Sequence, residues 1–83
     1  MELIFHYRNL DKHNVSEDEA EQAFNDPNGL TEKRYEGIYV CLGKTLEGRL
    51  LEMAYRKLNK DQALIFHAMN ARDNQKKRYK KRI

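Results

Sequence analysis

The sequence has little of what several common functional sites require. It contains one cysteine, so no disulfide can form within the chain, and its three histidines lie too far apart in sequence for a typical zinc site. No phosphate-cradling G-x-x-x-x-G-K loop occurs, and the only serine, Ser16, is better explained as a helix cap than as a nucleophile. Cys41 lies in an apolar run and is expected to be buried. The sequence thus predicts no metal and no small-molecule cofactor.

Long apolar runs are also missing. None approaches the roughly 20 residues that span a bilayer, and residues 1–6 lack the basic and apolar regions of a signal peptide. With 40% hydrophobic and 35% charged residues, the composition is typical of a globular domain rather than of a disordered or membrane protein. We therefore expect a cytoplasmic protein without a membrane partner, folded as a single domain over residues 1–83.

Charge is distributed unevenly along the chain. Residues 1–36 hold nine acids and four bases, whereas residues 37–83 hold four acids and twelve bases. The asymmetry is strongest at the end, where seven bases and one acid occur within residues 72–82. The bases are Arg72, Lys76, Lys77, Arg78, Lys80, Lys81 and Arg82.

Such a run repels itself, and phosphates would relieve the repulsion. Tyr79 lies among the bases and is suited to stack on a nucleobase. We therefore predict that residues 72–83 form a basic C-terminal helix or tail that binds RNA. Two alternatives fit the same composition: an acidic partner protein, and a solvated terminus without a partner.

Local patterns predict the helices. Ser16 and Glu19 form a capping box that starts a helix at Glu17, and Pro27 ends it near Asp26. A polar stretch at residues 8–14 also has helical character, and strong helix formers follow from residue 72. The expected architecture therefore has two N-terminal helices and a basic C-terminal helix.

Short apolar runs predict the strands. Three runs are expected to pair as antiparallel strands, and a fourth is an edge candidate: residues 38–42, 50–55 and 63–68, with 3–5 at the edge. The expected fold class is α+β, with a mainly antiparallel sheet of three to four strands.

One group of residues has the chemistry for RNA cleavage without a metal. That reaction needs a base for the 2′-hydroxyl proton, cations for the charged phosphate, and an acid for the leaving oxygen. His67, at the end of the third predicted strand, is the candidate base or acid, because imidazole exchanges protons near neutral pH. Tyr79 is a second proton donor. Basic residues lie near this position in the predicted fold: Arg49, Arg56, Arg72 and Lys77. The structural alternative is that His67 bonds a backbone carbonyl and the arginines are solvated.

Three stretches of the chain resemble the BrnT-like toxins of bacterial type II toxin–antitoxin modules, small ribonucleases of RelE-like fold. The stretches are KHNVSEDEAEQAFNDP at residues 12–27, LGKTLEGRLL at 42–51 and HAMNARDNQKKRY at 67–79. The resemblance implies a sheet with helices packed against it, and RNA bound across the sheet and the final helix. It also implies a cognate antitoxin that inhibits the protein and binds operator DNA.

The resemblance carries over to single residues with two departures. His67 and Ala68 match the first two letters of an H-A-R motif, but its arginine falls on Met69, and an acidic residue of the final helix falls on Gln75. Arg72, three residues past Met69, is the candidate substitute. The remaining matches are Arg49, Lys77 and Tyr79.

The leading functional hypothesis is therefore a toxin-like, metal-independent endoribonuclease. One alternative is a catalytically weakened or inactive module that binds RNA or an antitoxin. Another is an interaction protein whose acidic helix and basic tail both contact a single partner.

Overall fold

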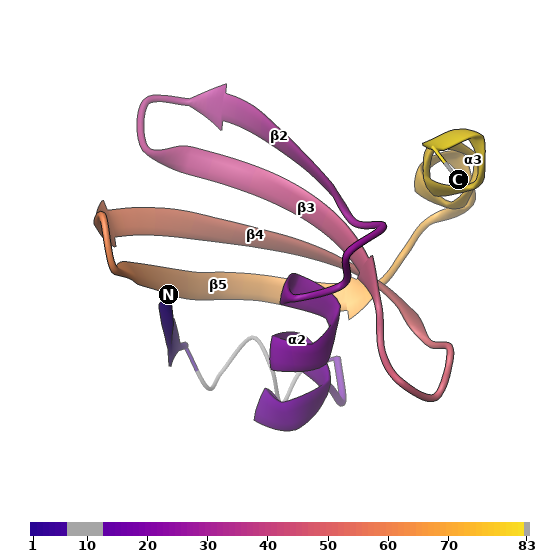
Figure 1. Cartoon of the computed structure of the whole chain (residues 1–83), viewed down its shortest axis with the longest axis horizontal. Helices are drawn as coiled ribbons and strands as arrows, with labels where there is room; N and C mark the ends of the chain where they lie inside the picture. The colour runs from indigo at the N-terminus through magenta and orange to yellow at the C-terminus, as the bar shows by residue number, and fades with distance from the viewer. Residues whose placement is uncertain (7–12, 83) are drawn as a thin grey trace.

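The computed structural model of the chain describes residues 1–6 and 13–82, and in this part the fold consists of one sheet and two helices (Figure 1). The sheet has five strands in the order β1-β5-β4-β3-β2. The strands are β1 (Glu2–Phe5), β2 (Leu30–Tyr35), β3 (Ile38–Lys44), β4 (Leu50–Asn59) and β5 (Gln62–Asn70). The helices are α2 (Glu17–Phe24) and α3 (Asp73–Arg82). Neither helix is long and apolar enough to cross a membrane.

The expected sheet of three to four mainly antiparallel strands with two N-terminal helices is wrong. The sheet is mixed, because β1 runs parallel to β5 while the other neighbours are antiparallel. A strand from the start of the chain pairs here with one near its end, and local patterns carry no information on the direction of such a pairing. Of the helix expected at residues 8–14, residues 8–12 lie outside the described part, and His13 and Asn14 form a turn. One N-terminal helix, α2, is therefore described.

The sequence also failed to indicate β2. Its sequence, LTEKRY, is dominated by polar residues, and its last three residues are exposed. Among the described strands it lies at the edge of the sheet and pairs with β3, through backbone hydrogen bonds that need no apolar side chains. Charged residues on such an edge discourage pairing with another chain. The hydrophobic signal that identifies central strands is therefore weak in β2.

The expected start of α2 is confirmed. The Ser16 side chain accepts a hydrogen bond from the Glu19 amide at 3.1 Å, and the Glu19 carboxylate accepts one from the Ser16 amide at 3.1 Å. The helix ends at Phe24, two residues before the predicted end. Its buried face consists of Ala20 and Ala23, small residues that allow the helix backbone to approach the sheet closely.

This close approach depends on Gly43 in β3. A Cβ atom added at Gly43 would lie 1.8 Å from the carbonyl oxygen of Ala23. The main hydrophobic core lies between α2 and the sheet, and its largest fully buried side chains are Leu51, Met53 and Ile65. Cys41 is 5% exposed, so its expected burial is confirmed.

The two helices contact opposite faces of the sheet. On β3, Cys41 belongs to the core under α2, whereas the next residue, Leu42, belongs to a second cluster with Ala71 and Tyr79. Successive side chains of a strand point to opposite faces, so α3 packs on the face that α2 does not cover. In Figure 1, α3 lies at the end of the sheet where β5 leads out, away from the β4–β5 turn. This position displays the basic helix at one end of the molecule.

Candidate nucleic-acid interface

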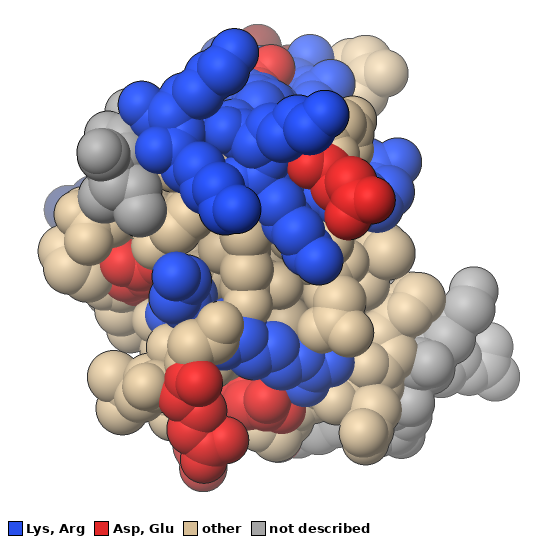
Figure 2. All heavy atoms as spheres, turned by 90° about the vertical axis from the view of Figure 1, so that its right-hand side faces the viewer, with Lys and Arg blue, Asp and Glu red and all other residues tan. Residues whose placement is uncertain are grey.

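Helix α3 forms a basic surface at one end of the molecule. Figure 2 shows this side, where Lys and Arg side chains gather over a broad area and acidic ones are few. Gln75 and Tyr79 are buried, at 5% and 4% exposure, and face the sheet. At 3.6 residues per turn, Lys76 and Lys80 then lie on one flank of the helix, and Lys77 and Lys81 point away from the sheet. All four lysines are exposed.

The arginines around α3 are engaged with acids of the sheet. Arg72 donates from Nη2 to Glu52 Oε2 at 2.7 Å and from Nε to Glu52 Oε1 at 3.2 Å. The Glu52 side chain is only 7% exposed, so Arg72 compensates a buried charge. Arg78 pairs with Glu32 of β2, and this hydrogen bond lowers the pKa of the Glu32 carboxyl. These two ion pairs attach α3 to the sheet.

The lysines of α3 are bound less firmly than the arginines. Lys76 Nζ lies 3.9 Å from Asp73, a carboxylate whose side chain is 95% exposed, so this pair is weak. Lys77, Lys80 and Lys81 are exposed on the helix. The side chain of Arg82 lies outside the described part. Of the predicted RNA-binding residues, the lysines are therefore the ones best placed to meet phosphates.

Tyr79 is buried rather than exposed for stacking. Its hydroxyl donates to Asp26 Oδ2 at 2.6 Å, and Lys44 Nζ lies 5.4 Å from the centre of its ring. Burial, with the bond to Asp26, raises the pKa of Tyr79 to about 12. Burial alone would raise the pKa of Asp26, but hydrogen bonds from Tyr79 and from the amides of Asn28 and Lys44 outweigh it and lower the pKa. Tyr79 therefore anchors α3 to the segment that follows α2.

Arg49 connects the start of β4 with the turn before α2. Its guanidinium donates to Asn70 Oδ1 at 2.6 Å, to Glu19 Oε2 at 2.9 Å, and to the carbonyl oxygens of Asn14 and His13 at 3.0 and 3.3 Å. The Ser16 amide and then Arg49 lower the pKa of Glu19. Four of the five guanidinium N–H groups are thus used within the protein.

The fold brings His13 against His67. Their ring centroids are 5.6 Å apart at an angle of 76°. Both imidazoles are half-buried, and Arg49 holds the backbone of His13 in place. In the sequence, the separation of the histidines was used only to argue against a metal site. No local pattern indicates that His13 and His67 meet in the fold, so this contact was not predicted. Within residues 1–6 and 13–82, no group of three or more metal-ligating side chains is present.

The remaining predicted residues, Arg56, Met69 and Gln75, lie on β4, β5 and α3. Arg56 is exposed in β4, two residues beyond Ala54, which is the cross-strand partner of His67. Met69 is the cross-strand neighbour of Glu52. Gln75 accepts a hydrogen bond from Arg78 at 3.2 Å. The catalytic roles assigned to Arg49, Arg72 and Tyr79 stay predictions, and all three side chains already have partners within the protein.

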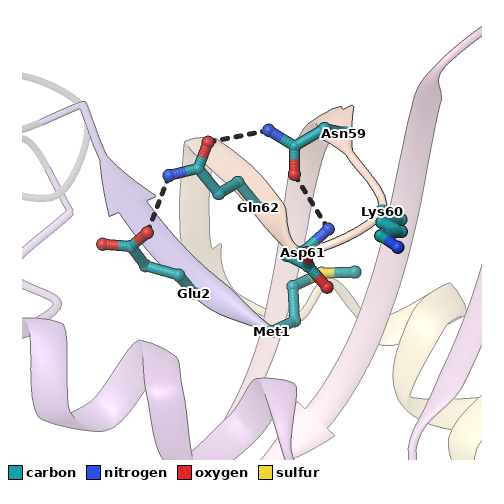
Figure 3. Close-up of a pocket in the computed structure, with 6 residues that line it drawn as sticks. All are labelled: Met1, Glu2, Asn59, Lys60, Asp61 and Gln62. Atoms are coloured by element: carbon teal, nitrogen blue, oxygen red, sulfur yellow. Dashed lines mark hydrogen bonds between the residues drawn. The ribbon is translucent and has the colours of Figure 1, made fainter.

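A hollow at the opposite end of the sheet offers no comparable site. It has a volume of about 580 Å³ and lies between the β4–β5 turn and the start of β1 (Figure 3). Its polar groups bond one another: Gln62 donates to Glu2 at 2.7 Å, Asn59 to Gln62 at 2.8 Å, and the Asp61 amide to Asn59 at 2.8 Å. These bonds attach β1 to the turn, which accounts for the side chains of Glu2, Asn59 and Gln62 without a ligand.

Comparison with known proteins does not assign the chain. No family model matches it, and no sequence of a curated protein matches it either. The resemblance to the BrnT-like toxins therefore stays a prediction. The arguments about function rest on the basic surface of α3 and on the histidine pair.

Proposed function

We propose that the protein binds RNA through the lysine surface, which we define as Lys44, Lys76, Lys77, Lys80 and Lys81. The observation that carries the proposal is how the bases around α3 are paired. Arg72 and Arg78 form close ion pairs with Glu52 and Glu32, whereas the lysines are exposed and, among the described residues, only the ammonium group of Lys76 has an acid, Asp73, within 4 Å. A helix attached to its own domain by arginines presents the lysine charges in a fixed arrangement. Fixed cations lose less conformational freedom on binding than a frayed tail does.

The salt dependence of binding is the first test. Four or five lysine–phosphate contacts on single-stranded RNA predict a slope of log K against log salt of about −2.8 to −3.5, at about −0.7 per contact. If Arg72 and Arg78 also left their carboxylates for phosphates, the slope would be about −5. Fluorescence anisotropy with a labelled 12-nucleotide RNA, measured between 50 and 300 mM salt, distinguishes these values. Absence of binding at 50 mM salt would refute the proposal.

A matched pair of variants tests where the RNA binds. We expect K77Q/K81Q to reduce the slope by about 1.4, because two contacts are lost. The control is K57Q/K60Q, which removes the same charge from two exposed lysines near the end of β4 and in the β4–β5 turn, at the other end of the sheet (Figure 1). This control should leave the slope unchanged. Equal effects of the two doubles would mean that net charge, and not the α3 surface, governs binding.

Cleavage of RNA is a second candidate function, supported by the contact between His13 and His67. In metal-independent cleavage, a base takes the 2′-hydroxyl proton, the 2′-oxygen attacks phosphorus, and an acid gives a proton to the departing 5′-oxygen. The products are a 2′,3′-cyclic phosphate and a 5′-hydroxyl end. Two neighbouring imidazoles supply both proton transfers. A toxin-like endoribonuclease of a type II toxin–antitoxin module would act in this way.

Cleavage is tested with labelled RNA in the presence of EDTA. H13A and H67A should each abolish formation of the cyclic phosphate end, whereas H6A, which changes an exposed histidine, should retain it. M69R, which restores the arginine of the resembled motif, should increase the rate. Intact RNA with the wild-type protein at every pH between 5 and 8 would exclude cleavage and leave RNA binding as the function.

An antitoxin partner is proposed on the resemblance alone. It predicts a short DNA-binding protein encoded by the neighbouring reading frame. Co-expression of the two proteins should give a complex that no longer binds RNA. A neighbouring protein that does not co-purify would contradict this part of the proposal.

A further inference from the structure

A cavity lies between α3 and the turn that connects β3 with β4. It has a volume of about 200 Å³. Its lining residues are Lys44, Gly48, Leu50, Lys76, Tyr79 and Lys80. Three lysines from two segments that are distant in sequence thus line it, and no acidic residue is among these lining residues. A cavity with this lining favours an anion.

The uncharged part of the lining favours a flat apolar group as well. Leu50 is half-buried at the start of β4, and Tyr79 is packed against Leu42. Gly48 has φ +93°, and a Cβ atom there would meet nothing within 4 Å, so the turn leaves one wall open. The volume is below the roughly 300–1,000 Å³ of usual small-molecule sites. The cavity therefore suits one unit of a longer ligand better than a free cofactor.

We propose that this cavity is a subsite for one unpaired nucleotide of the bound RNA. The base enters against Leu50, which is half-buried, and Lys44, Lys76 and Lys80 contact the phosphates on either side of it. The inference rests on the proposed RNA binding and narrows it to RNA with an unpaired base, because a base held in a duplex stack cannot enter a cavity. Lys77 and Lys81, on the outer side of α3, contact phosphates without regard to base pairing.

Two double variants of equal charge separate the subsite from the rest of the lysine surface. At 0.1 M salt, loss of two phosphate contacts should weaken binding of single-stranded RNA by about 25-fold, from the slope of about 0.7 per contact. K77Q/K81Q should show this loss alone. K44Q/K80Q should lose about fivefold or more beyond it, because a base released from the cavity also loses its contacts with the protein. With an RNA duplex, the two doubles should be equally weakened.

A measurement on the unaltered protein supports the variants. Titration with adenosine 5′-monophosphate should shift the amide signals of Gly48 and Leu50 more than those of Lys77 and Lys81. Inorganic phosphate should move the Leu50 signal far less, since it brings no base.

The inference fails if both doubles lose the same affinity for single strands, if duplex and single strand bind equally well, or if the nucleotide shifts no signals around the cavity. Those results would leave RNA binding itself in place. A protein that binds no RNA at all would instead overturn the proposed function together with this inference.

Discussion

Removing the Tyr79 hydroxyl tests how α3 is attached to the domain. The hydroxyl is buried and donates to Asp26 Oδ2 at 2.6 Å, an acceptor that carries a full negative charge at neutral pH. Tyr79→Phe keeps the ring, its packing against Leu42 and its contact with Lys44, and removes only this bond. The substitution therefore isolates one of the links between α3 and the rest of the protein.

The expected cost follows from the surroundings of Asp26. A hydrogen bond to a charged group is worth about 1.5–3 kcal/mol. Asp26 is half-buried and keeps the amide donors of Asn28 and Lys44, so the lower value, about 1.5 kcal/mol, applies. With about 2.1 cal/mol/K of unfolding entropy per residue, the 83 residues give about 0.17 kcal/mol/K. The Tm should fall by about 9 °C.

Thermal unfolding followed by circular dichroism measures this shift, and Tyr35→Phe is the matched control. Tyr35 is 74% exposed, so loss of its hydroxyl should leave the Tm within about 1 °C. Amide hydrogen exchange should also be about tenfold faster in α3 of Tyr79→Phe. If the two variants unfold at the same temperature, the bond to Asp26 does not hold α3 in place.

The same variant should change the response to acid. The folded pKa of Asp26 is lowered from its usual 3.8, so its contribution to stability is fully present above that value and is lost as the pH falls through the folded pKa. Without the Tyr79 hydroxyl the pKa of Asp26 rises toward its usual value, so protonation of Asp26 removes less stability from the variant than from the wild type. The difference in unfolding free energy between wild type and Tyr79→Phe should therefore shrink below about pH 4. A difference that is constant down to pH 2 would contradict this reasoning.

Three further predictions concern the packing of α2 and β3. Gly43→Ala should cost about 3 kcal/mol or more, or prevent folding, because its Cβ would lie 1.8 Å from the backbone oxygen of Ala23. The control, Gly48→Ala, introduces only backbone strain at φ +93° and should cost about 1–2 kcal/mol. Equal losses of Tm in the two variants would refute the close approach of α2 to β3. Burial raises the pKa of Cys41 to about 12, so the folded protein should react with a thiol reagent at pH 8 only as fast as it opens, and reaction within seconds would refute burial. Ser16→Ala should lower the Tm by about 6 °C through loss of the cap. Ser16→Asp should keep most of the stability that the cap provides, because aspartate also caps helices.

Short-range patterns determined several elements of the fold. The capping box at Ser16 and Glu19 is a contact between residues three positions apart, so the start of α2 could be predicted from the sequence. The central strands β3, β4 and β5 are buried enough to need apolar runs, which identified them and their antiparallel pairing. The edge strands carry weaker signals. β2 is held by backbone pairing with β3, and the parallel partner of β1 lies near the other end of the chain.

The sequence determines how much charge the end of the chain carries, whereas the tertiary structure determines which of these charges face a ligand. Seven bases in residues 72–82 establish that the end of the chain is strongly basic. Which of them face a ligand depends on the carboxylates that the fold brings near, because arginine forms equally good pairs with a carboxylate and with a phosphate. Arg72 pairs with Glu52, which is buried in β4, and Arg78 pairs with Glu32, so both arginines bind carboxylates of their own domain.

The sequence by itself determined a small α+β domain with a capped helix, three central strands and a basic end. Only the tertiary structure decided that His13 touches His67, that Tyr79 is buried against Asp26, and that Lys44 joins the lysines of α3 around a cavity. The physical reason is the range of the interactions. Caps, turns and strand patterns act between near neighbours, whereas each of these contacts joins segments that are brought together only when the whole sheet has formed.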